Sequence, residues 1–205
     1  KPYSNLFYWA HAWTLNKKST IGLHPHQGFE ICSFVLEGSI NHFDTKQDKW
    51  ISLNKGDVQI IRAGNGISHA EELNEKSEIF QIWLDPNIQL SITKEASYDD
   101  YKSEDFEIVE KNGTKIKKIA GNNCPMEIFS EGIEINTYDI LEKIELNLEL
   151  KNDSVYSYFV LDGNASINEE KVEKGDFFIV SDSKDLVIIA SSITKIFEIK
   201  SPKRP

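Results

Sequence analysis

The chain has 205 residues, of which 40% are hydrophobic and 27% charged, and its net charge is −10. This composition is typical of a globular protein with one large or two small domains. The acidic balance argues against direct nucleic-acid binding and against anionic membranes, because both attract clustered Lys and Arg. Cys32 and Cys124 are too few for a disulfide framework, and no apolar run could span a bilayer. We therefore expect reduced thiols, no membrane partner and a cytoplasmic location.

Short runs rich in Ile, Val, Phe and Tyr alternate with Gly and Pro along the whole chain. This spacing is typical of an all-β fold, either a sandwich or a barrel. The clearest runs are residues 31–36, 58–61, 79–84, 156–161, 177–180 and 187–189. Between the third and fourth runs, residues 97–105 are acidic around two tyrosines, which predicts a short helix or a polar linker.

The sequence repeats one pattern. Residues 34–40 (FVLEGSI) precede a Lys-Gly-Asp turn at 55–57, and residues 159–167 (FVLDGNASI) precede a second one at 174–176. Both copies read as strand, acidic-Gly turn, strand, Lys-Gly-Asp turn and strand, which indicates two related β-domains. We place the first domain at 1–100 and the second at 101–205. All five histidines lie at or before residue 69, so we expect only the first domain to bind metal and the second to lack metal ligands.

Two short motifs carry the chemistry, His24-Pro25-His26 and His69-Ala70-Glu71. Residues i and i+2 of a strand share one face, so each motif can point both polar side chains into the same interior. Alone, each motif is more often a surface or hydrogen-bonded pair. On neighbouring strands, three imidazoles and one carboxylate would converge on one point.

Such a set suits a divalent transition metal and would leave two positions open in an octahedron. Its residual charge of about +1 would favour an anionic oxygen ligand. Nitrogen and oxygen donors with open positions favour Fe(II), while Mn, Co, Ni, Cu or Zn also fit. A closed structural zinc site would more often use cysteine.

The sequence leaves two possible roles or environments open for each of four other residues. Glu30 is a rival fourth ligand or an acceptor for an imidazole N–H. His42 is expected to be packed or on the surface. His11 lies among aromatic residues and is read as core or pocket wall. Arg62 either orients a substrate or is a solvated residue at the end of a strand.

The resemblance to a known family is carried by HPHQGFE, VLEGSINHFD, KGDVQIIRAGNGISHAE and FQIWLDP, which start at residues 24, 35, 55 and 80. These segments resemble the pirin family of bicupins, although Gln27 stands where many members have Arg. The second half is similar more diffusely. The resemblance implies two cupin-type β-barrel (jelly-roll) domains in one chain, with a metal, usually iron, in the first. It implies the ligands His24, His26, His69 and Glu71, and so prefers Glu71 to Glu30.

The resemblance also implies two functions. Some members cleave quercetin-type flavonols with O2, and others are metal-dependent regulators that bind proteins. We expect a metal-dependent dioxygenase of the quercetin 2,3-dioxygenase type, which opens a flavonol or related enolic aromatic with Glu71 as catalytic proton acceptor. The alternatives are a metal- or redox-responsive protein that binds a partner without catalysis, and a cupin sugar isomerase or epimerase. A monomer is expected, because the second domain takes the place of a partner subunit.

Overall fold

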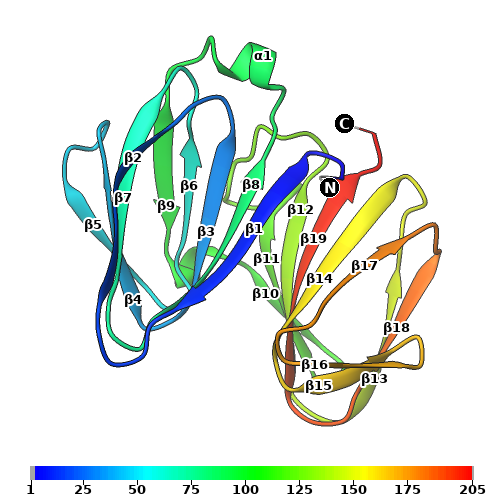
Figure 1. Ribbon diagram of the computed structural model, residues 1–205. Helices are drawn as coiled ribbons and strands as arrows, with labels where there is room; N and C mark the ends of the chain where they lie inside the picture. Colours follow the sequence, from blue (N-terminus) through cyan, green and yellow to red (C-terminus); the bar gives the residue numbers. More distant parts are fainter. Residues whose placement is uncertain (1–2, 205) are drawn as a thin grey trace. The chain divides into compact units, whose positions relative to one another are not determined.

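The computed structural model describes residues 3–204 and divides into two compact units (Figure 1). The first unit ends at Asp105, and the second begins at Phe106. Both units consist of antiparallel sheets, which confirms the predicted all-β fold of two cupin-type barrels. Among the described residues, no helix has the length and apolarity that a membrane crossing requires.

The first unit contains a five-stranded sheet in the order β1-β8-β3-β6-β9 and a four-stranded sheet in the order β2-β7-β4-β5. Its elements are β1 (Leu6–Trp13), β2 (Ser19–His26), β3 (Glu30–Glu37), β4 (Ser39–Asp44), β5 (Trp50–Asn54), β6 (Val58–Arg62), β7 (Ile67–Leu73), β8 (Glu78–Leu84), α1 (Ile88–Ser91), β9 (Ser97–Tyr101) and the 3-10 turn η1 (Ser103–Asp105).

The second unit contains a six-stranded sheet in the order β10-β11-β12-β19-β14-β17 and a four-stranded sheet in the order β13-β18-β15-β16. Its strands are β10 (Ile108–Lys111), β11 (Thr114–Ala120), β12 (Glu134–Ile140), β13 (Ile144–Glu149), β14 (Ser154–Asp162), β15 (Asn164–Ile167), β16 (Glu170–Glu173), β17 (Phe177–Ser181), β18 (Asp185–Ala190) and β19 (Thr194–Pro202).

The repeated turns of the sequence occupy equivalent places in the two units. Gly38 and Gly163 both have positive φ, at 66° and 80°, and a Cβ at either would collide with a backbone carbonyl oxygen. In each Lys-Gly-Asp turn the Asp carboxylate accepts a backbone N–H three residues earlier, at 3.0 Å for Asp57 and 2.8 Å for Asp176. Strand order and turn chemistry therefore support a duplicated β-unit.

The interior of the first unit is layered along the strands. One apolar cluster contains Ile31, Ile61 and Ile67, and a second contains Val35, Ile40 and Leu73. Between these two clusters the inward positions of the same strands are polar and almost all buried: Ser33, His42, Gln59, His69, Glu71 and Gln81. A buried polar layer of this kind is costly unless its groups are paired or bind a ligand.

The prediction for residues 97–105 is wrong. Residues Ser97–Tyr101 form β9, which pairs with β6, and only Ser103–Asp105 form a helical turn. The strand forms because Tyr98 is buried in the barrel, while Asp99 binds the guanidinium of Arg62 at 2.5 Å. The one α-helix of the described residues, α1, was not expected from the sequence.

Candidate metal centre

The two histidine motifs lie on adjacent strands. In the β2–β7 pairing His24 is opposite His69, and Pro25 is opposite Ser68. The register shifts between Ile21 and His24, where β2 holds one residue more than β7. Beyond this bulge, His24 and His26 lie on the inward face that His69 shares.

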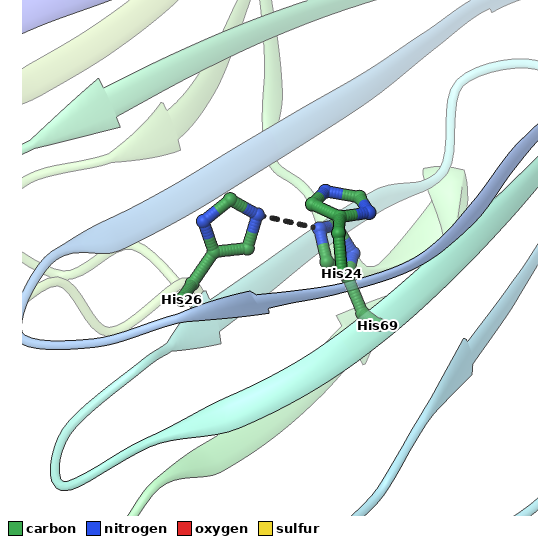
Figure 2. Close-up of side chains that lie close together, drawn as sticks. All are labelled: His24, His26 and His69. Carbon is green, nitrogen blue, oxygen red and sulfur yellow. Dashed lines mark hydrogen bonds between the residues drawn. The ribbon is translucent and has the colours of Figure 1, made fainter.

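Three imidazoles converge in the structure. The Nε2 atoms of His26 and His69 lie 3.0 Å apart, and the rings of His24 and His69 are 4.5 Å apart between centroids (Figure 2). One nitrogen from each of His24, His26 and His69 lies within 4.8 Å of the other two. Two nitrogens bound at right angles to one ion at about 2.1 Å would be separated by ~3.0 Å. The observed spacing therefore fits a shared cation.

The protonation of these rings also suits metal binding. The Nδ1 of His24 lies 2.7 Å from the carbonyl oxygen of Gly22, so Nδ1–H donates there and Nε2 is left as a lone pair. Burial, and then the neighbouring His24, lowers the pKa of His26 to about 4. Burial and the surrounding imidazoles lower the pKa of His69 to about 3. The rings of His26 and His69 are therefore neutral near pH 7, which is the form that binds a cation.

Glu71 lies beside this group rather than within it. Its carboxylate falls within 4.8 Å of His42 and His69, so the structure contains two overlapping groups of three that share His69. Gln59 donates to Glu71 Oε1 at 3.1 Å, and Gln81 donates to both carboxylate oxygens at 3.3 Å. Burial raises the pKa of Glu71, against the opposing influence of His42 and these amides.

His42 is packed, one of the two places expected for it from the sequence, but its position beside Glu71 was not predicted. It is fully buried on β4, directly opposite Glu71, and its Nε2 lies 2.7 Å from Asp44 Oδ2. Its ring stacks on Tyr98 with centroids 4.5 Å apart and planes inclined by 12°. The spacing of His42 and Asp44 within a strand was the available signal, because two residues at i and i+2 share a face.

The other candidates lie elsewhere. Glu30 is buried with its carboxylate 3.9 Å from Arg62 Nε and joins neither group of candidate ligands. Arg62 is itself buried and bound to Asp99, so it is not a solvated residue. His11 Nε2 lies 2.7 Å from Glu78 Oε1 and also belongs to neither group.

A partly exposed aromatic wall borders the cluster on one side. Phe29 and Trp83 stack with centroids 4.9 Å apart, and each lies just over 5 Å from the ring of His26. Trp83 also stacks on the exposed Tyr8 at 4.0 Å. His24 and His26 are partly exposed whereas His69 is buried, so solvent reaches the cluster at His24 and His26.

The second unit has apolar residues at the matching positions. Leu148 on β13 is opposite Leu186 on β18, as His24 is opposite His69. Ile167 on β15 is opposite Ile188, as His42 is opposite Glu71. Ile167, Leu186 and Ile188 are buried in the core of that unit.

Comparison with solved structures identifies the fold of the chain. The chain matches the structure of bacterial pirin YhhW in complex with nickel(II) from Escherichia coli with a TM-score of 0.79 and 22% identity, over 98% of this chain and 83% of that one. This likeness shows the fold, a protein of two cupin-type barrels.

Sequence comparisons show a resemblance to one family. Residues 5–84 match the model of the family described as Pirin. Pirin-like protein 2 of Arabidopsis thaliana is 38% identical over 51% of this chain, although the match covers only 32% of that relative. Quercetin 2,3-dioxygenase of Escherichia coli strain K12 is 26% identical over 88% of this chain and 76% of its own length. The predicted resemblance to the pirin family is confirmed, and the family model matches the part of the chain that forms most of the first unit.

Proposed function

We propose that the first unit binds one divalent transition metal through His24, His26, His69 and Glu71, with Fe(II) as the physiological ion. The observation that carries this proposal is the convergence of one nitrogen from each of three imidazoles within 4.8 Å of one another, at the edge of the buried polar layer. The second unit, with leucine and isoleucine at the matching positions, would have a structural or substrate-shaping role.

We further propose a dioxygenase of the quercetin 2,3-dioxygenase type, which opens a flavonol or a related enolic aromatic with O2 and releases CO. The stacked rings of Phe29 and Trp83 support a flat aromatic substrate, because an extended π-system packs well against such a surface. The name of the Escherichia coli relative agrees with this substrate class.

The protein's own residues would bind the substrate and accept its proton. Phe29 and Trp83 would hold the aromatic rings, and Glu71 would accept the proton of the flavonol hydroxyl at a carboxylate oxygen. Gln59 and Gln81 fix that carboxylate through their amide N–H groups. When bound, a divalent metal with open positions supplies Lewis acidity and a template for the reactants.

The test is a reaction of the Fe(II)-loaded protein with quercetin under air, followed by the loss of flavonol absorbance and by trapping of CO. We expect loss of absorbance with release of CO. His69→Ala should abolish both, while His11→Leu, which changes a histidine outside both groups, should react like the wild type. Equal rates in the wild type and His69→Ala would remove the dioxygenase assignment.

A further inference from the structure

Asp44 holds His42 in one orientation. Asp44 Oδ1 accepts the backbone N–H groups of Lys46 and Gln47, both at 2.7 Å, and its Oδ2 lies 2.7 Å from His42 Nε2. A carboxylate that is already an acceptor for two amides accepts from the imidazole as well, so the proton of His42 lies on Nε2. The stacked ring of Tyr98 restricts rotation of the imidazole.

This arrangement leaves His42 Nδ1 as a lone pair without a partner. The atom is buried and has no hydrogen bond among the described residues. An unpaired buried acceptor is costly, so its presence points to a role in a bound state.

His69 also has a buried ring nitrogen, Nδ1, with no hydrogen-bond partner among the described residues. Its Nε2 is the atom nearest to His26, at 3.0 Å, and is therefore the nitrogen that would face a shared cation. Binding through Nε2 places the ring proton on Nδ1, and this Nδ1 is also buried without a partner. The two rings lie 5.7 Å apart between centroids. The acceptor Nδ1 of His42 and the donor Nδ1–H of His69 thus lie on neighbouring imidazoles.

We propose that His42 is a positioning residue, which accepts the Nδ1–H of His69 and, anchored by Asp44, orients that ligand toward the metal. This inference rests on the proposed metal site and adds two residues to it. The hydrogen-bonded series runs from Asp44 through His42 to His69. Metal-binding histidines ordinarily donate their second N–H to an acceptor that fixes the tautomer, and loss of such an acceptor typically costs 10–100-fold in affinity.

The experiment is a Co(II) titration of the full chain, followed by visible absorption, for the wild type, His42→Leu, His42→Asn and Asp44→Asn. We expect one Co(II) per chain in all four. His42→Leu should bind 10–100-fold more weakly. His42→Asn should recover most of the affinity, because its amide oxygen lies near the place of Nδ1. The Co(II) affinity of Asp44→Asn should lie between those of His42→Leu and His42→Asn. Band positions should not change, because the ligands are unchanged.

His11→Leu is the matched control, since it removes another imidazole paired with a carboxylate in the same unit and should bind like the wild type. Equal affinity in the wild type and His42→Leu would overturn the positioning role, as would failure of His42→Asn to exceed His42→Leu. Shifted Co(II) bands in His42→Leu would make His42 a ligand and overturn it too. If His42→Leu does not fold, the comparison of His42→Asn and Asp44→Asn with the wild type decides. No binding by the wild type would instead refute the metal site itself.

Discussion

Addition of Zn(II) should raise the thermal stability of the first unit alone. A ligand present at 100 times its Kd stabilises the folded state by about 2.7 kcal/mol. For a unit of roughly 100 residues, each kcal/mol raises Tm by about 4–8 °C, so we expect a shift of about 10 °C or more. The second unit offers Leu148, Leu186 and Ile188 at the matching positions, so its transition should not move.

The distribution of tryptophan makes the assay selective. All four tryptophans, Trp9, Trp13, Trp50 and Trp83, belong to the first unit. Tryptophan fluorescence therefore follows the unfolding of the first unit, while far-UV circular dichroism follows both. Zn(II) is suited to this measurement because it has no redox chemistry.

Two variants separate a specific site from general metal binding. His69→Leu should abolish the Zn(II)-dependent shift, because it removes the residue that both candidate groups share. In the absence of metal it should cost little, since the lost imidazole has a buried nitrogen that finds no partner among residues 3–204. His11→Leu should keep the full shift. A shift in His69→Leu equal to that of the wild type, or an equal shift of the second unit, would refute the reasoning.

Three further predictions concern stability. Gln81→Leu removes a donor from both oxygens of buried Glu71 and should cost about 1–3 kcal/mol in urea unfolding followed by fluorescence; an unchanged midpoint would contradict this. Gly38→Ala should cost about 1–3 kcal/mol because φ is positive and the Cβ collides, whereas Gly22→Ala, with open space, should be neutral or slightly stabilising in the same assay. Burial raises the pKa of Glu198, so the unfolded state loses its proton first and stability should fall as pH rises from the unfolded pKa to the folded one. Glu198→Gln should remove that slope when urea midpoints are followed by circular dichroism between pH 4 and 8, and an unchanged slope would exclude Glu198 as its cause.

The strands and the histidine pairs could be predicted because both depend on local periodicity. Alternation places His69 and Glu71 on one face of β7, and the same rule places His24 and His26 on one face of β2. The sequence could not show that these strands are neighbours, and the resemblance to a family supplied that expectation. The structure brings the three imidazoles together, while the assignment of all four side chains as ligands stays a prediction.

The residues that sequence reasoning missed depend on non-local pairing. His42 lies opposite Glu71 only because β4 and β2 flank β7 on its two sides. Gln59 and Gln81 come from the facing sheet, and nothing near them in the chain marks them as partners of a carboxylate. Residues 97–101 look like a linker by charge, yet pairing with β6 and burial of Tyr98 make them a strand.

The bulge in β2 has a consequence for protein engineering. Deleting one residue between Ile21 and His24 would remove the bulge, leave Ile21 opposite Glu71 and His24 opposite His69, and keep the histidines on the inward face. The corresponding strand β13 pairs with β18 in unbroken register from Ile144 to Glu149. Grafting the donors into the second unit would therefore require new side chains, beginning with Leu148 and Leu186, and no inserted residue in β13. Point substitutions alone could thus convert a barrel without metal ligands into one that has them, with no change in chain length.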